Sequence, residues 1–326
     1  MDVRIKYLDC ASVREETLVA LKGRDINIIE SEDPEYVIYS VGGGEHLKYN
    51  CPRIFITGEN TQPDFNVCDY AIAFGYMTFD DRYKRIPLYR FYLEDYDRAI
   101  HKHEIVLSDE MISKRKFCNF VYSNGTTAQK DRDEFYYNLC KYKSVDSGGR
   151  HLNNVGGPVE SKFDFQKKYK FSIAFENACT PGYTTEKILQ AFAAGTIPIY
   201  YGNPRIAEDF NNKAFINCHE YNSFEEVIEK IAEIDNDDSL FRKYISEPIF
   251  SDNLYDEPLK EYGDFLEYIF RQGPEKAKRR CDYNIASVYQ NEMKKYWFLK
   301  ELRDNRTIKN RIINKIVNNK RKSIGM

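Results

Sequence analysis

The chain has 326 residues, a net charge of −3, and a composition that is 42% apolar and 15% aromatic. Such a chain can fill hydrophobic cores, which excludes general disorder, and its length suggests two domains. Its apolar runs are much shorter than a membrane helix, and its first residues lack the hydrophobic stretch of a signal peptide, so we expect a cytoplasmic protein. The eight cysteines form no Cys-x-x-Cys pair, and we interpret them as reduced thiols.

The first third of the chain has the pattern of an α/β domain. Residues 3–7 alternate as a half-buried strand does, and residues 12–15 form a capping box for a helix that Gly23 can end. Apolar runs separated by turn residues predict further strands at 26–29, 36–41, 54–56 and 70–74. Short strands mixed with helices favour a mostly parallel sheet.

A second α/β pattern begins near residue 113. Residues 117–122 are a predicted strand, and 132–142 a predicted helix that the acids at its start would cap. The later predicted elements are strand 171–176, helix 186–194, strand 197–201 and a capping box at 223–226. The first three of these form a compact βαβ crossover.

These patterns divide the chain into domains at 1–112 and 113–290 and a basic tail at 291–326. The tail holds 11 Lys or Arg and 3 acidic residues, so it carries +8 while the remaining 290 residues carry −11. Apolar residues interspersed with the basic ones favour an amphipathic helix on an anionic membrane surface. The alternative is that residues 293–302 pack across the domains. The acidic body argues against nucleic-acid binding.

Ligands of open α/β sheets bind beyond the carboxyl ends of the strands, and Glu59 follows the predicted strand at 54–56. A partly desolvated carboxylate there could act as a general base toward a hydroxyl. The alternative is a solvated turn acid or a helix cap.

Two cations stand where a helix disfavours them. Arg132 and Lys187 both fall in the first turn of a predicted helix, at the positive end of its dipole. Together with backbone N–H groups they could bind a phosphate or pyrophosphate. The alternatives are solvation or pairing with Asp131, Asp133 or Glu186.

A metal site is not expected. Asp131-Arg132-Asp133 is similar to a D-x-D metal motif, but its acids begin a helix, which favours capping. His101 and His103 lack partner ligands.

The stretch Phe175-Glu-Asn-Ala-Cys-Thr-Pro-Gly-Tyr-Thr-Thr-Glu-Lys187, followed by Ile197-Pro-Ile-Tyr-Tyr-Gly202, resembles the donor-site signature of the α-1,3/4-fucosyltransferases, glycosyltransferase family 10. The F-E-N, Y-x-T-E-K and I-P-x-x-x-G parts occur in the family's order and spacing. Supporting similarity extends from residue 54 to about 269, and the bacterial members are the most similar.

The resemblance implies the GT-B fold, in which two Rossmann-like domains face each other. The N-terminal domain would bind the acceptor and the C-terminal domain GDP-fucose. By position, Glu59 matches the family's base, and Arg132 and Lys187 its phosphate-binding cations. Its remaining donor contacts match Asn177, Tyr183 and Glu186.

The implied reaction is inverting transfer of L-fucose from GDP-β-L-fucose to a hydroxyl, O3 above all, of N-acetylglucosamine in a lactosamine-type glycan. The product would be an α-linked Lewis-type glycan. No cofactor is required, since fixed cations can do the work of a metal. The alternatives are a transferase for another nucleotide sugar and a non-catalytic sugar-nucleotide or glycan-binding protein. For the location we expect the cytoplasm, with the tail as the contact to the inner face of the plasma membrane.

Overall fold

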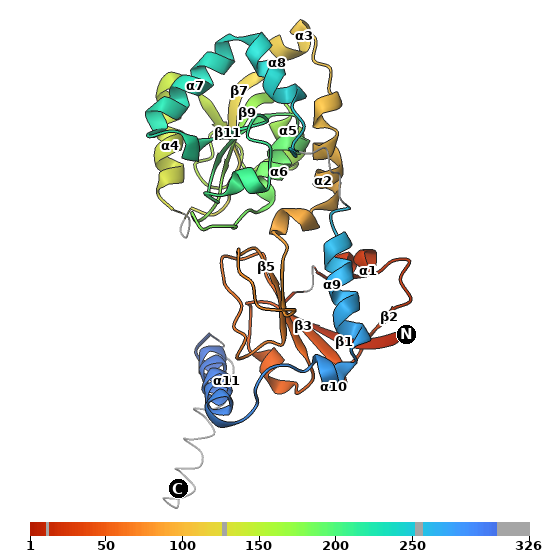
Figure 1. Cartoon of the computed structure of the whole chain (residues 1–326). Helices are drawn as coiled ribbons and strands as arrows, with labels where there is room; N and C mark the ends of the chain where they lie inside the picture. The colour runs from red at the N-terminus through yellow and green to blue at the C-terminus, as the bar shows by residue number, and fades with distance from the viewer. Residues whose placement is uncertain (11–12, 126–128, 252–256, 305–326) are drawn as a thin grey trace, which may run out of the picture.

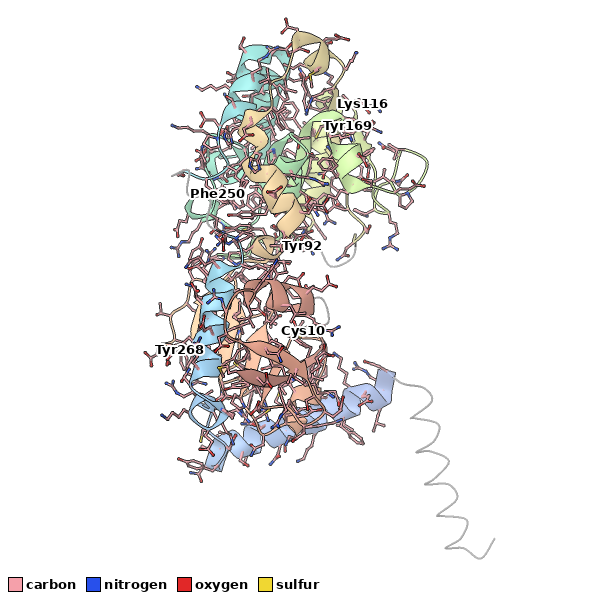
Figure 2. The ribbon with its side chains drawn as sticks, turned by 90° about the vertical axis from the view of Figure 1, so that its right-hand side faces the viewer. Cys10, Tyr92, Lys116, Tyr169, Phe250 and Tyr268 are labelled. Carbon is pink, nitrogen blue, oxygen red and sulfur yellow. The ribbon has the colours of Figure 1, made fainter. Side chains whose placement is uncertain are left out.

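The computed structural model describes residues 1–10, 13–125, 129–251 and 257–304. Two parallel sheets form two lobes that lie one above the other in Figure 1. This arrangement confirms the α/β fold with two facing domains. Figure 2 shows Tyr92 where the lobes meet, Cys10 in the first lobe, and Lys116 and Tyr169 in the second.

The first sheet has six strands in the order β2-β1-β3-β4-β5-β6, all parallel. Its strands are β1 (Asp2–Leu8), β2 (Asn27–Glu30), β3 (Tyr36–Tyr39), β4 (Arg53–Ile56), β5 (Tyr70–Ala73) and β6 (Tyr83–Arg85). Strands β3, β4 and β5 are buried throughout, because both of their faces are covered. The predicted strands of this region are confirmed. The predicted helix is α1 (Val13–Ala20); the capping residue expected at Ser12 lies outside the described residues.

The second sheet has five strands in the order β11-β10-β9-β7-β8. They are β7 (Lys116–Phe120), β8 (Val145–Ser147), β9 (Tyr169–Phe175), β10 (Ile197–Tyr201) and β11 (Ile216–Asn217). The helices around it are α3 (Asp109–Ser113), α4 (Asp131–Tyr142), α5 (Lys162–Gln166), α6 (Glu186–Ala193), α7 (Phe224–Asn236) and α8 (Asp238–Ser246). The βαβ crossover β9-α6-β10 is confirmed, and so is the cap at Ser223, whose Oγ accepts from the Glu226 amide.

The predicted boundary at residue 290 does not follow the packing. Helices α9 (Lys260–Arg271) and α10 (Pro274–Ala277) lie on the first sheet, as Figure 1 shows. Tyr262 of α9 is fully buried there and shares a 2.7 Å hydrogen bond with Thr17 of α1. The apolar face of α9 covers the first sheet, so the chain returns to its first domain.

The tail begins as a helix earlier than expected, because α11 runs from Asn284 to Asp304. Met293 and Trp297 pack on the core of the first domain, whereas neighbouring apolar side chains stay exposed. Residues 305–326 of the predicted tail lie outside the described residues. No described helix has the length and apolar character to span a membrane.

Specific contacts join the two lobes. Helix α2 (Leu93–Ile100) packs on α6, and Arg85 of β6 forms two 2.8 Å bonds with Asp209 of the second lobe. The Tyr76 ring lies between the guanidinium groups of Arg85, at 4.0 Å, and Arg205, at 3.7 Å. These contacts fix the carboxyl ends of the two sheets relative to each other.

Candidate active site

Lys187 lies at the start of α6 and is held there by the buried carboxylate of Glu176. Glu176, which follows β9, has no exposed side-chain surface. Its carboxylate accepts from the amide and hydroxyl of Thr185, at 2.7 and 2.6 Å, and from Lys187 Nζ at 3.0 Å. Desolvation lowers the pKa of Lys187, but Glu176 and Glu186 outweigh it, and the net result is a raised pKa. Of the predicted pairing partners, Glu186 Oε1 lies 3.7 Å from Lys187 Nζ, and Asp133 Oδ1 lies 3.7 Å from Arg132 Nε.

Glu176 is a site residue that the sequence interpretation did not single out. It stands directly after a strand in which every residue is buried. An acid at such a position must find a cation or donors, because an unpaired buried charge is very costly. That rule applied to Phe175-Glu176 would have indicated a partner such as Lys187.

Arg132 is also buried, with 2% of its surface exposed, rather than projecting into solvent from the first turn of α4. One Nη donates to the Asn124 carbonyl and the other lies 3.5 Å from Asn177 Oδ1. The guanidinium group lies 4.3 Å from the centre of the Tyr122 ring. Its Nε has no hydrogen-bond partner among the described residues.

The two cations approach the same buried side chain. Burial raises the pKa of Tyr122, and the charges of Lys187 and Arg132 both act against that rise. The Tyr122 hydroxyl donates to carbonyls near the end of β9 and accepts from the Phe175 amide. Tyr122 therefore links Arg132, which lies over its ring, to the end of the central strand β9.

The other residues predicted to contact the donor lie in the segment that follows β9. Asn177 is half-buried, and its carbonyl accepts from the Gln129 amide. Tyr183 is 3% exposed, and desolvation raises its pKa to about 12. Burial raises the pKa of Glu186, but Lys187 and Lys162 lower it further, so the net shift is downward.

Tyr183 also touches the first lobe. Its ring packs edge-on against Phe74 at 5.1 Å, and Gly182 has a φ of +85°. A Cβ on Gly182 would stand 2.4 Å from the Phe74 carbonyl, so only glycine allows this approach. Asn60 and Thr180 form a second contact between the lobes, at 3.0 Å.

Glu59 belongs to the first lobe, where it lies in the loop after β4 and is exposed. Its backbone amide donates a hydrogen bond to Thr57 Oγ1 at 3.0 Å. It lines a cavity of about 540 Å³ with Asp9, Glu16 and Tyr92. The charge of Glu59 contributes to the raised pKa of Tyr183, which places the two groups within electrostatic reach of each other. Because the neighbouring Asn60 contacts Thr180 of the second lobe, Glu59 stands where the two lobes meet.

The metal alternative gains no support from the described residues. They contain no group of three His, Cys, Asp or Glu side chains that could hold a metal ion. Asp133 binds His151 Nε2 at 2.8 Å. The predicted capping role of these acids is wrong, because Lys130 occupies the N-cap of α4 without a side-chain capping bond.

Family models match both halves of the chain. The N-terminal domain of α-(1,3)-fucosyltransferase FucT matches residues 5–92. The C-terminal part of glycosyltransferase family 10 (fucosyltransferase) matches residues 111–246. Together the two models match more than half of the chain.

Curated relatives include α-(1,3)-fucosyltransferase FucT of Helicobacter pylori, with 36% identity over 247 residues, or 64% of this chain and 48% of that protein. GDP-fucose protein O-fucosyltransferase 3 of Homo sapiens is 30% identical over 185 residues, or 53% of this chain and 39% of that protein. The chain thus spans less than half the length of these relatives.

Solved structures agree with the fold. A crystal structure of an α1,3-fucosyltransferase has a TM-score of 0.72 and 27% identity, covering 87% of this chain and 93% of that one. A structure of an α1,3-fucosyltransferase with GDP-fucose has a TM-score of 0.67 and 28% identity, covering 82% and 90%.

Proposed function

Because the chain belongs to glycosyltransferase family 10, the fucosyltransferases, we propose that it transfers L-fucose from GDP-β-L-fucose to a glycan hydroxyl with inversion. The observation that carries the proposal is the pair of cations at the end of β9, where Lys187 binds Glu176 and Arg132 contacts Asn177. We assign the phosphates to the cations and the acceptor to the cavity beside Glu59.

Each cation keeps a hydrogen-bond donor for a phosphate. An ammonium group has three donors, and Lys187 directs two toward Glu176 and Thr185. Arg132 Nε makes no hydrogen bond to a described residue, although Asp133 Oδ1 lies 3.7 Å from it as an ion pair. Negative charge grows on the β-phosphate as fucose leaves, so these fixed donors would stabilise the leaving GDP. Asn177, Tyr183 and Glu186 stand beside them and are the proposed remaining donor contacts.

Glu59 is the proposed general base. The acceptor hydroxyl must attack the sugar from the face opposite to GDP, and Glu59 belongs to the other lobe from the cations, next to the contact between Asn60 and Thr180. Its exposed carboxylate is accessible to that hydroxyl, and a bound acceptor would shield it from water. We further propose O3 of N-acetylglucosamine in a lactosamine-type glycan as the acceptor, and no essential metal.

Incubation with GDP-fucose and an acceptor panel tests the function. The panel contains lactosamine glycans, a glucose-terminated glycan and, in view of the similarity to a protein O-fucosyltransferase, a folded Ser/Thr-containing domain. We expect GDP release and an α-1,3-linked product with lactosamine. GDP-fucose that binds without transfer to any acceptor would favour a binding protein, and turnover of only another GDP-sugar would favour the other transferase.

We also propose that the basic tail binds an anionic membrane surface. Tyr296 and Leu299 of α11 are more than half exposed, while Trp297 packs on the first domain. Truncation after Asp304 should keep transfer in vitro but abolish sedimentation with anionic liposomes at low salt. Equal sedimentation of full-length and truncated protein would contradict the proposal.

A further inference from the structure

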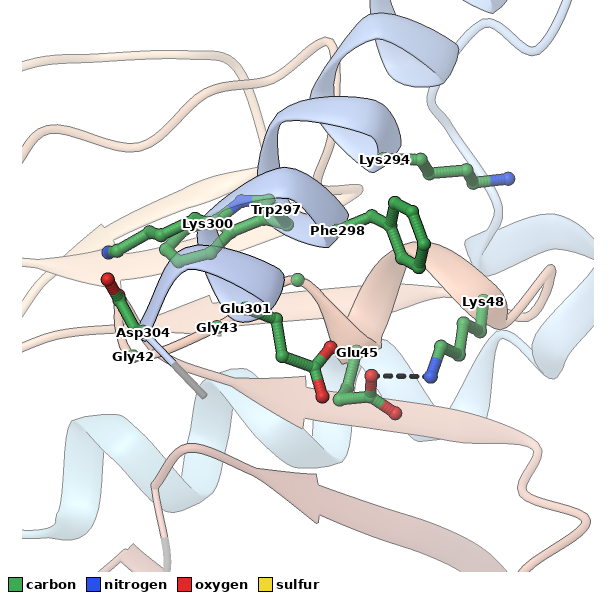
Figure 3. A pocket seen from close by; sticks show the side chains of 11 residues that line it. Gly42, Gly43, Glu45, Lys48, Lys294, Trp297, Phe298, Lys300, Glu301 and Asp304 are labelled. Atoms are coloured by element: carbon green, nitrogen blue, oxygen red, sulfur yellow. Dashed lines mark hydrogen bonds and ion pairs between the residues drawn. The ribbon is translucent and has the colours of Figure 1, made fainter. Parts of the chain in front are cut away.

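A second cavity, of about 490 Å³, lies between α11 and the loop after β3 (Figure 3). Its floor on the first domain is the run Gly42-Gly43-Gly44, and its wall on α11 includes Trp297 and Phe298. The proposed transfer of fucose assigns no role to this cavity.

The glycine run separates this cavity from the one that holds Glu59. Gly42 lines both cavities. A Cβ on Gly43 would lie 2.7 Å from Asp9 Oδ2, and one on Gly44 would lie 2.5 Å from Trp297 Cβ. The absence of side chains lets Asp9 and Trp297 approach the loop from either side. It also leaves no side chain of the run standing between the two cavities.

The lining of the second cavity suits an uncharged saccharide. Phe298 is 57% exposed, although it lies on a helix whose neighbouring Trp297 packs on the domain core. The cavity is also lined by three lysines and three acids, which balance in charge: Lys48, Lys294, Lys300, Glu45, Glu301 and Asp304. An exposed aromatic ring gives a sugar an apolar face to pack on, and the charged side chains around it can bind its hydroxyls.

We propose that this cavity is a distal subsite for an extended acceptor glycan. The sugar that receives fucose lies beside Glu59, the chain crosses the glycine run at Gly42, and the following sugars pack on Phe298. The inference rests on the proposed function, since it assigns the acceptor to the cavity beside Glu59.

A kinetic comparison of acceptor lengths tests the subsite. Phe298→Ala removes a lining ring, and Leu299→Ala is the matched control, because Leu299 is similarly exposed, at 62%, but does not line the cavity. We expect the unmodified protein and the control to use a lactosamine hexasaccharide with about tenfold higher kcat/KM than the disaccharide. Phe298→Ala should lose most of this gain while keeping the disaccharide rate. A gain that persists in Phe298→Ala, or no gain in the unmodified protein, would overturn the subsite and leave fucosyl transfer standing.

Binding without donor separates the subsite from the reaction. The hexasaccharide is titrated into the full-length protein and both variants by calorimetry. We expect Phe298→Ala to bind about five- to tenfold more weakly than Leu299→Ala, whether or not transfer is observed. Equal affinities, or no binding to the unmodified protein, would overturn the proposal even if fucose is transferred to the disaccharide. Glu301→Ala provides a second lining variant with the same expected direction.

Discussion

In the second lobe Lys187 is half-buried, Arg132 is buried, and both are bonded to neighbours, whereas Glu59 in the first lobe is exposed and no described residue binds its carboxylate. The proposed donor side is therefore held in place by its own contacts, which would suit a diphosphate of fixed geometry. The proposed acceptor side consists of loops after β1, β3 and β4 around open cavities. Such a side can change its acceptor by loop changes while the donor side stays the same.

The largest expected effect concerns the pair Lys187–Glu176. Lys187→Ala leaves a fully buried carboxylate without its cation, and we expect about 3–5 kcal/mol lower free energy of unfolding, with weaker GDP binding. Chemical denaturation and calorimetry with GDP measure the two losses.

A double variant separates these two roles. Glu176→Gln with Lys187→Ala removes the unpaired charge, so most of the stability should return while GDP binding stays weak. GDP affinity that recovers together with stability would mean that Lys187 acts only in folding.

The next effect tests the acceptor side. Glu59→Gln should lower kcat about 100-fold or more, because the general base is lost, and should leave stability and GDP affinity nearly unchanged. Glu16→Gln is the control, since it changes another acid of the same cavity and should have a much smaller effect. Similar losses in both variants would argue against Glu59 as the base.

A smaller effect on stability is expected when the pH is lowered. The folded pKa of Glu186 lies below its ordinary value of 4.5, so its contribution to stability is present above that pH and is lost as the pH falls through the folded pKa. The Tm difference between the protein and Glu186→Gln should be constant from about pH 7 to 5 and shrink below 4.5. A difference that grows on acidification would reverse the sign of this shift.

The smallest expected effect is that of metal removal. If the fixed cations Lys187 and Arg132 stabilise the leaving GDP, EDTA should leave most of the transfer rate intact. Complete loss that Mn²⁺ restores would show that the preformed donor side is incomplete and would renew the metal hypothesis for Asp131 and Asp133.

The sequence by itself determined the parallel α/β units, the position of Glu59 after a strand of the first sheet, and that of Lys187 in the first turn of a helix. Strand β10 occupies the residues predicted for it, 197–201, and the cap at Ser223 is present. These features are local, since strand patterns and caps depend on residues a few positions apart.

Only the tertiary structure decided the contacts between residues that lie far apart in the chain. It placed α9 on the first sheet, buried Arg132 against Tyr122, paired Glu176 with Lys187, and set Trp297 against the Gly44 loop. Each of these depends on which surface is left uncovered or which buried charge lacks a partner after folding. Sequence spacing does not report such conditions, because they arise from the packing of distant elements.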